Sequence, residues 1–369
     1  MKILQVCHRF YPVVGGTEDG VLQISKWFVK WGHDVLVVTS HEPNTKFDDN
    51  VESIRVKRVP IIKIGTKRFP MLSFYRKLFE EHYDIVMIHG QAVWCSDYLF
   101  PFMKFFNVPI IFTAHGFYLL EMRNNLIDKL YYNWCLSSHC RRFDWIVART
   151  EHEKNILVSW GVNKARISII YHGIVPERYE NPKKDFREKF NIRNKYILLY
   201  VGGFFENKRV DRLIESCSKL KEDYVLVVIG RDVPVSKYNR DYCEKLTKKL
   251  SVNVLFTGLV SEEDLISAYG SADIFLLGSQ FEGFGGVLLE SMCSQIPFIS
   301  FDTGAADELA KKGGGFCVKS VDEMTEKINY LLKNEDERRK MGERGKIVAK
   351  DYTWERAAEM HIEVFRKVQ

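Results

Sequence analysis

The chain has 369 residues, of which 46% are hydrophobic, 13% aromatic and 28% charged, with 24 glycines and 10 prolines. This balance excludes a disordered, collagen-like or low-complexity protein, and the length predicts two domains rather than one. The net charge of +6 is too small to indicate nucleic-acid binding. No apolar run approaches the roughly 18 residues that a membrane-spanning helix needs, so none is expected.

The first half of the chain alternates short apolar, β-rich runs with segments of helical period. This alternation is typical of a parallel sheet covered by helices. A first helix is expected around Val21, Ile24 and Phe28, which share one face, and Gly32 would end it. The expected strands are Ile3–Cys7, Asp34–Thr39, Ile54–Val59, Asp84–His89, Pro109–Ala114, Trp145–Ala148 and Ile167–Tyr171.

A second series of strands follows residue 190. Its expected members are Tyr196–Val201, Tyr224–Ile229, Asn253–Phe256, Asp273–Leu277, Ile296–Ser300 and Phe316–Val318. The prolines and mixed charges of 175–185 indicate a linker between the two series. We therefore expect an N-terminal domain over 1–175, a linker over 176–190, a C-terminal domain over 191–350, and a last helix over 351–369 that packs back toward the N-terminal domain. Ligand would bind in a cleft between the carboxyl ends of the two sheets.

The spacing of metal-ligating residues predicts no metal site. The eight cysteines include no C-x-x-C pair, and the 10 histidines form no H-E-x-x-H motif. The cysteines are interpreted as buried thiols. The chain begins with a strand rather than an apolar signal-peptide region, so a cytoplasmic protein is expected.

Two glycine-containing turns are candidates for binding an anion. Gly15 and Gly16 precede the first helix, where backbone N–H groups can approach a phosphate, although an ordinary turn would have the same residues. The segment from Glu282 to Glu290 is more specific, because it places one carboxylate at a strand end and the other on the next helix. The free N–H groups of that helix can hold a diphosphate, while the carboxylates accept hydrogen bonds from sugar and ribose hydroxyls.

With this segment the chain resembles the family 4 glycosyltransferases, which are retaining enzymes of the GT-B type. The E-x7-E block from Glu282 to Glu290 carries most of the resemblance. Further matches are Thr113–Gly116, Ile170–Ile174, Tyr200–Ile214, Phe256–Val260, and Gly304 with Glu308. The resemblance spans nearly the whole chain. It implies an α/β fold of two Rossmann-like, doubly wound domains that face one another across a cleft.

The resemblance also implies roles for particular residues. Glu282 and His115 would be the catalytic residues that contact the sugar of a nucleotide-diphosphate-sugar donor, and Glu290 would bind its ribose. Lys208 would neutralise the diphosphate. The other donor-binding residues implied are Gly15, Gly16, Arg209, Phe284, Gly285, Gly286 and Val287.

The chain departs from the family pattern at three positions. Gly203 stands where the family usually has arginine, and Arg209 is a candidate for partly replacing that cation. His172 stands where asparagine is common, and Gly286 replaces a frequent bulky residue. Gly203 thus removes one of the two cations expected at the diphosphate, whereas His172 and Gly286 indicate an unusual fit of donor or acceptor.

The reaction implied is transfer of a sugar, with retention, to a hydroxyl acceptor that is a lipid-linked or other glycan. Fixed dipoles and cations can stabilise the departing diphosphate, so the resemblance implies neither a metal nor a cofactor beyond the donor itself. Two alternatives stay open: a nucleotide-sugar epimerase or hydrolase on the same fold, and a binding subunit without turnover.

The segment 53–79 is strongly basic. It has four aromatic residues, no acidic residue and eight basic ones: Arg55, Lys57, Arg58, Lys63, Lys67, Arg68, Arg76 and Lys77. Such a segment gains about 1 kcal/mol per cation near an anionic bilayer. We therefore predict peripheral attachment to the cytosolic membrane face, with the apolar stretch 98–106 adding to the surface. The alternative is that Arg55 and Lys57 form the solvated face of a strand.

Overall fold

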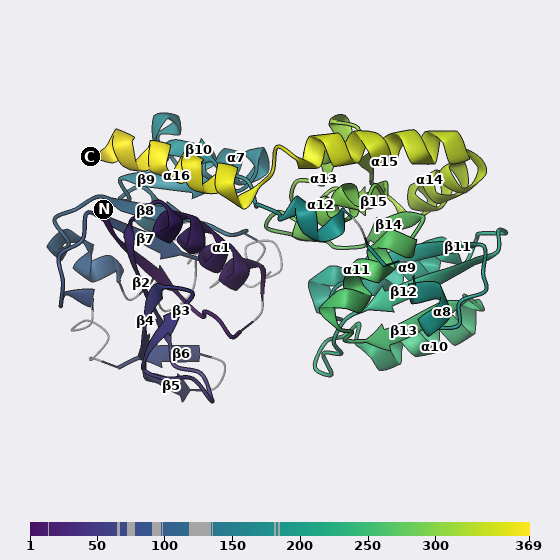
Figure 1. Cartoon of the computed structure of the whole chain (residues 1–369), viewed down its shortest axis with the longest axis horizontal. Helices are drawn as coiled ribbons and strands as arrows, with labels where there is room; N and C mark the ends of the chain where they lie inside the picture. The colour runs from purple at the N-terminus through teal and green to yellow at the C-terminus, as the bar shows by residue number, and fades with distance from the viewer. Residues whose placement is uncertain are drawn as a thin grey trace. The chain divides into compact units, whose positions relative to one another are not determined.

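The computed structural model describes residues 1–13, 15–64, 67–71, 78–90, 97, 99–117, 134, 136–180, 182–183 and 185–369. It divides into two compact units (Figure 1). The first comprises Met1–Gly173 with Trp354–Gln369, and the second comprises Ile174–Thr353. Each unit has its own parallel α/β sheet, which confirms the prediction of two Rossmann-like domains.

The first unit contains an eight-stranded sheet in the order β10-β9-β8-β7-β1-β2-β4-β3. All neighbours pair in parallel except β3 and β4. The strands are β1 (Lys2–Cys7), β2 (Asp34–Ser40), β3 (Asp48–Val51), β4 (Ile54–Val59), β7 (Ile85–His89), β8 (Ile110–Thr113), β9 (Trp145–Ala148) and β10 (Ile167–Ile169). All seven strands expected in this half are present, whereas β3 and a separate hairpin of β5 (Ile61–Ile64) and β6 (Lys67–Pro70) were not expected.

The predicted first and last helices pack together in the first unit (Figure 1). Helix α1 (Gly16–Lys30) buries Val21, Ile24 and Phe28, and Gly32 follows it with a φ of 79°. Helix α16 (Trp354–Val368) contacts α1, and the Phe28 and Phe365 rings lie 5.5 Å apart. Because this face of α16 is apolar, the end of the chain belongs to the first unit.

The second unit contains a six-stranded parallel sheet in the order β13-β12-β11-β14-β15-β16. This is the strand order of a dinucleotide-binding Rossmann fold. The strands are β11 (Tyr196–Val201), β12 (Tyr224–Ile229), β13 (Val254–Gly258), β14 (Ile274–Leu277), β15 (Phe298–Phe301) and β16 (Gly315–Val318). All six match the expected strands within a few residues, because buried parallel strands are continuous apolar runs that are easily recognised.

Helices connect the strands in both units. In the first unit these are η1 (Phe100–Phe105), α6 (Ser137–Cys140), α7 (Glu151–Ser159) and η3 (Lys164–Arg166). In the second unit they are η4 (Pro176–Tyr179), α8 (Phe186–Lys189), η5 (Glu206–Lys208), α9 (Val210–Cys217), α10 (Arg240–Leu250), α11 (Glu262–Ser271), α12 (Gly286–Cys293), α13 (Ala306–Lys311), α14 (Val321–Lys333) and α15 (Glu335–Ala349).

The segment 176–190 is not the linker that the sequence suggested. Tyr179 and Phe186 are 5% and 1% exposed. Helices η4 and α8 both pack on α11, so this segment belongs to the second unit. Pro176 begins the short helix η4 and does not mark a free connection.

Three features of the described residues concern metal binding, membrane spanning and the cysteines. Within them there is no group of three or more histidine, cysteine or acidic side chains that could hold a metal ion. No helix in the described part of the chain is long and apolar enough to span a membrane. Five cysteines are buried as free thiols, as predicted: Cys7, Cys140, Cys217, Cys243 and Cys293.

Candidate functional site

Two of the predicted site residues, Lys208 and Glu282, meet at the carboxyl edge of the second sheet. Lys208 follows β11 and Glu282 follows β14, and the strand order reverses between these two neighbouring strands. Ligands bind at such switch points in open α/β sheets. The Lys208 Nζ lies 2.6 Å from the Glu282 Oε1, which also accepts a hydrogen bond of 2.6 Å from the Ser279 hydroxyl. The structure therefore brings together a cation and a carboxylate where a ligand is expected.

Backbone contacts fix the two loops that carry this pair. The Asn207 amide donates to the carbonyl of Phe281 at 3.1 Å, and the Gln280 N–H donates to the carbonyl of Asn207 at 2.7 Å. A Cβ atom at Gly278 would lie 2.5 Å from the carbonyl oxygen of Arg209. Because only glycine permits this approach, the end of β14 and the start of α9 can lie against each other.

The start of α12 is open to an anion. Its N-cap residue, Gly285, has a φ of 90°, no side chain caps the helix, and its first turn contains no acidic residue. Gly286 and Val287 are therefore the first residues of a helix whose N–H groups favour negative charge. The backbone of Gly304 packs closely against this turn, since a Cβ atom at Gly304 would clash with the carbonyl of Phe284.

Glu290 lies on α12 and is held by a buried tyrosine. The Tyr269 hydroxyl donates to the Glu290 Oε2 at 2.7 Å, and the Tyr269 side chain is fully buried. Burial raises the pKa of Tyr269 well above its usual value, so its hydroxyl stays protonated and can donate. The sequence pattern does not predict Tyr269, because a tyrosine on the preceding helix has no spacing that marks it as a partner.

Arg209 does not accompany Lys208, contrary to the prediction that it partly replaces a missing cation. Its backbone is left-handed, with a φ of 48°. Its guanidinium donates to both carboxylate oxygens of Asp211, at 2.9 and 2.7 Å, and lies 4.6 Å from the centre of the Tyr238 ring. The charge of Arg209 is thus already neutralised within α9.

A different arginine occupies the space beside Gly203. The Cγ atom of Arg231 lies 3.4 Å from where a Cβ atom of Gly203 would be. Its guanidinium lies 5.0 Å from the centre of the Phe205 ring, and its side chain is exposed. Within the described residues Arg231 forms no ion pair. Its position two residues after the end of β12 is the signal that could identify it.

His115 follows β8 in the first unit. Its φ of 57° is uncommon for a residue other than glycine, and such strained positions concentrate at functional sites. Its ring contacts that of His89, with 3.0 Å between the His115 Nε2 and the His89 Nδ1. Burial and the nearby Arg149 guanidinium lower the pKa of His115 well below its usual range. His115 is therefore neutral near pH 7.

Gly15 and Gly16 lie at the start of α1, also in the first unit. The Glu18 carboxylate occupies the space where a side chain of Gly15 would be. Burial raises the pKa of Glu18, which carries its carboxylate at the helix end that favours anions. A phosphate near Gly16 would therefore need either to displace the Glu18 side chain or to bind while the Glu18 carboxyl group is protonated.

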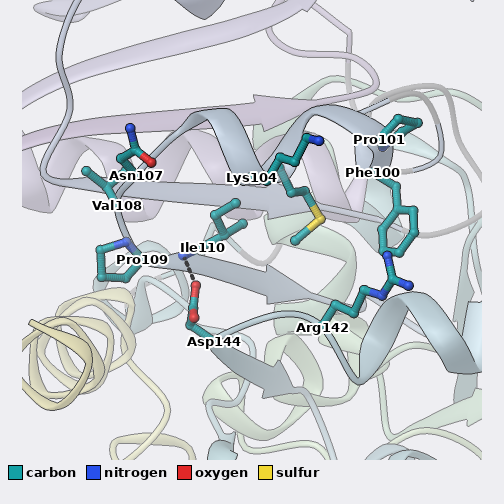
Figure 2. Close-up of a pocket in the computed structure, with 10 residues that line it drawn as sticks. Phe100, Pro101, Lys104, Asn107, Val108, Pro109, Ile110, Arg142 and Asp144 are labelled. Carbon is teal, nitrogen blue, oxygen red and sulfur yellow. Dashed lines mark hydrogen bonds between the residues drawn. The ribbon is translucent and has the colours of Figure 1, made fainter.

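A hollow of about 690 Å³ lies at the edge of the first sheet where strands β8 and β9 begin, opposite the carboxyl edge that carries His115 (Figure 2). It is lined by Phe100, Pro101, Met103, Lys104, Asn107, Val108, Pro109, Ile110, Arg142 and Asp144. The Arg142 guanidinium lies 4.9 Å from the centre of the Phe100 ring, and Asp144 accepts the Ile110 N–H at 2.8 Å. Neither Lys104 nor Arg142 pairs with a described carboxylate. None of the site residues predicted from the sequence lines this hollow.

Three of the eight cations in 53–79 are engaged within the first unit. Arg55 and Lys57 pair with Glu81 at 2.9 and 3.6 Å. Arg58 is 1% exposed and lies 2.8 Å from the Asp49 carboxylate. These three residues do not offer free charge to a membrane. The side chains of the other five cations lie outside the described residues.

Two family models together match most of the chain. The model of "Glycosyltransferase Family 4" matches residues 14–178, and that of "Glycosyl transferases group 1" matches residues 182–348. The chain is 26% identical over 397 residues to the uncharacterized glycosyltransferase MJ1069 of Methanocaldococcus jannaschii, covering 100% of this chain and 99% of that protein.

Two further similarities are more distant. Alpha-monoglucosyldiacylglycerol synthase of Streptococcus pneumoniae is 22% identical over 315 residues, covering 81% of this chain and 71% of its own. The structure of HepE from Anabaena, in complex with UDP and glucose, superimposes with a TM-score of 0.79 at 18% identity, covering 100% of both chains. The similarity to the HepE structure establishes a shared fold.

Proposed function

Because the chain belongs to the family 4 glycosyltransferases, we propose that it transfers a sugar, with retention, from a nucleotide-diphosphate sugar to a hydroxyl acceptor. One observation carries this proposal. The Lys208–Glu282 pair, 2.6 Å apart, lies at the switch point of the second sheet. Glu282 belongs to the loop that leads to the uncapped start of α12. A cation, a carboxylate and free helix N–H groups are what a sugar diphosphate requires.

Each part of the site has a proposed role toward the donor. The N–H groups of Gly286 and Val287 would hold the diphosphate, next to the turn at Phe284 and Gly285, and Lys208 would neutralise it. Glu290, oriented by Tyr269, would accept hydrogen bonds from the ribose hydroxyls. The UDP and glucose bound to HepE support a nucleotide sugar as donor.

The proposed reaction breaks the bond between the anomeric carbon and the diphosphate oxygen, and the electron pair leaves with the oxygen. Lys208 and the start of α12 stabilise the charge that develops there. The acceptor hydroxyl attacks from the same face and gives its proton to the departing phosphate. Glu282 and His115 would position the sugar, and no protein group is assigned as the base. The proposal includes no metal ion or cofactor.

Product analysis tests this function. A thermal-shift panel of nucleoside diphosphates and nucleotide sugars first identifies the donor, because a ligand at 100 times its dissociation constant stabilises by about 2.7 kcal/mol. Transfer predicts acceptor-dependent release of nucleoside diphosphate and a new glycoside whose anomeric configuration, read by NMR, matches the donor. An altered free nucleotide sugar would instead indicate an epimerase, and binding without turnover a non-catalytic subunit.

For the acceptor we propose a lipid-linked or other glycan at the cytosolic face of an anionic membrane. The name of the Streptococcus pneumoniae relative, a glucosyldiacylglycerol synthase, supports a lipid. In the first unit the Phe105 side chain on η1 is 57% exposed. Its neighbour Lys104 and Arg142 lack described carboxylate partners. In this proposal, these cations act together with Lys63, Lys67, Arg68, Arg76 and Lys77 of the segment 53–79.

Co-sedimentation with liposomes tests the membrane proposal. Binding should appear with anionic vesicles at low salt and fall steeply at high salt. It should disappear when Lys63, Lys67, Arg68, Arg76 and Lys77 are changed to serine. The matched control changes five exposed lysines of the second unit to serine: Lys219, Lys245, Lys248, Lys249 and Lys340. Protein that stays in the supernatant with anionic vesicles at low salt would rule out this proposal and favour a soluble acceptor.

A further inference from the structure

A series of buried hydrogen bonds connects α1 with the residue after β8 in the first unit. The Ser25 hydroxyl donates to the carbonyl of Val21 at 2.5 Å, and the Gln5 amide nitrogen donates to the Ser25 oxygen at 2.6 Å. The Gln5 Oε1 lies 2.9 Å from the His89 Nε2, and the His89 Nδ1 lies 3.0 Å from the His115 Nε2. Gln5, Ser25 and His89 are all fully buried.

The carbonyl at one end gives this series a single direction. A carbonyl oxygen can only accept, so the proton between Val21 and Ser25 belongs to the Ser25 hydroxyl. The Ser25 oxygen is then an acceptor, so the side chain of Gln5 must turn its NH₂ toward Ser25. This orientation places the Gln5 oxygen against His89, which must therefore carry its proton on Nε2.

The same reasoning fixes the proton of His115. A neutral imidazole with its proton on Nε2 has a lone pair on Nδ1. The His89 Nδ1 is therefore an acceptor, and His115 must donate from its own Nε2. The remaining nitrogen of His115, Nδ1, then carries a lone pair, and no described residue donates a hydrogen bond to it.

Burial and nearby positive charge keep the rings of His89 and His115 neutral. Arg149 is 2% exposed, and its Nη1 donates to the carbonyl of Ile170 at 3.1 Å. Burial, and after it the Arg149 guanidinium, lower the pKa of His89 and of His115 well below the usual range. Two further imidazoles contribute to the same surroundings: His172 and His361. A positive charge on His115 is thus opposed from several elements of the unit.

We infer that Gln5 and His89 are positioning residues that fix His115 in the neutral Nε2–H tautomer, so that its Nδ1 accepts a hydrogen bond from a sugar hydroxyl. The part of this inference that concerns the sugar depends on the proposed function, whereas the tautomer does not. The series passes through Gln5 on β1 and His89 on β7, the two strands between which the order of the first sheet reverses. It therefore connects the backbone of α1 to the ligand-binding edge of that sheet.

The tautomer can be measured in the wild-type protein without any donor. NMR of protein labelled with ¹³C and ¹⁵N at histidine distinguishes Nδ1–H from Nε2–H, and a His115→Asn variant assigns the resonance. We expect both His115 and His89 to carry the proton on Nε2 at pH 7. A proton on the His115 Nδ1 would overturn the inference, whether or not sugar transfer is observed.

Two substitutions of His89 separate positioning from folding. His89→Phe removes the acceptor, so His115 should become a mixture of tautomers and kcat should fall about tenfold, the size of one neutral hydrogen bond, with donor KM within about twofold. His89→Asn keeps an acceptor oxygen close to the position of the His89 Nδ1, so most of the wild-type tautomer of His115 and most of the wild-type kcat should return. The matched control is His41→Phe, because the His41 ring bonds to the nearby Thr45 carbonyl and lies outside the series, so the change should alter neither property.

Thermal unfolding of each variant checks that it folds. A His89→Phe protein that folds and keeps both the wild-type tautomer of His115 and the wild-type kcat would overturn the inference. If the tautomer changes but kcat does not, the contact of His115 with the sugar is wrong, while the fixing of the tautomer stands. Wild-type protein that shows the expected tautomer but transfers no sugar would count against the proposed function alone.

Discussion

Replacing Lys208 by alanine perturbs the proposed donor site directly. The Lys208 and Glu282 side chains are 24% and 11% exposed, so their ion pair lies between a surface pair, worth about 0–1 kcal/mol, and a buried pair, whose disruption costs about 3–5 kcal/mol. We expect the variant to lose about 1–2 kcal/mol of unfolding free energy. The Ser279 hydroxyl still bonds Glu282, which limits this loss.

The effect on transfer should exceed the effect on stability. Removing a charged contact to a partly desolvated diphosphate costs about 2–4 kcal/mol, which corresponds to a loss of about 30-fold to about 1000-fold in kcat/KM. Calorimetry should show weaker binding of nucleoside diphosphate, and initial rates of its release should show the loss in kcat/KM. The matched control is Lys245→Ala, whose pair with Asp241 has a similar length of 2.7 Å but is 75% and 70% exposed. This control should change both measurements by less than about twofold.

Glu282→Gln completes the test, because it removes the carboxylate charge and leaves Lys208 in place. The freed cation should bind nucleoside diphosphate at least as tightly as in the wild type, while kcat falls because the contact with the sugar is weakened. The reasoning is refuted if Lys208→Ala melts at a lower temperature but binds nucleoside diphosphate and turns over like the wild type. Lys208 would then only stabilise the loop of Glu282.

Tyr269, Gly203 and His361 provide three further tests. Tyr269→Phe removes the donor to Glu290 and should weaken nucleotide binding by about threefold to tenfold in calorimetry; unchanged affinity would exclude a role in orienting Glu290. Gly203→Arg should raise the donor KM, because a Cβ atom at Gly203 would lie 2.9 Å from the Phe205 ring and 3.4 Å from the Arg231 Cγ, so the new side chain must displace one of them. Arg231→Gln should weaken binding of nucleoside diphosphate but not of nucleoside. A lower KM for Gly203→Arg would contradict this reasoning. Burial lowers the pKa of His361 to about 3 in the folded chain, so the unfolded chain takes up a proton below about pH 6.5 that the folded chain does not. Stability should therefore fall as the pH is lowered from about 6.5 toward 3, by up to about 1.4 kcal/mol per pH unit for this group, and His361→Leu should flatten the dependence of melting temperature on pH.

The sequence predicted the central strands of both sheets because their burial is local information. A strand covered on both faces must be apolar along its whole length, and β12 (Tyr224–Ile229) is buried at every residue. The missed strand β3 (Asp48–Val51) begins with two aspartates, which have low β propensity. It pairs at the edge with β4, and Asp49 bonds the buried Arg58. Only the tertiary contact makes this segment a strand.

The same distinction separates the parts of the site that were predictable from those that were not. Glu282 and Glu290 lie within one short segment, so their spacing reveals both at once. Tyr269 on α11 donates to Glu290 on α12 from 21 positions earlier in the chain. His89 and Gln5 are 84 positions apart, and their bond depends on the pairing of β1 with β7. No periodicity of the sequence encodes such contacts.

Gly203 illustrates why the residues of a motif must be considered together with their neighbours in space. Counted along the chain, glycine in place of arginine removes one cation from the donor site, and Arg209 is the nearest substitute in sequence. In space Arg209 is bound to Asp211, while Arg231, from the end of the adjacent strand β12, lies against Gly203 and the Phe205 ring. Strands β11 and β12 are parallel neighbours, so their carboxyl ends present residues to the same edge. A cation lost after one strand can therefore be supplied after the next, and Gly203 by itself is no evidence of lost turnover.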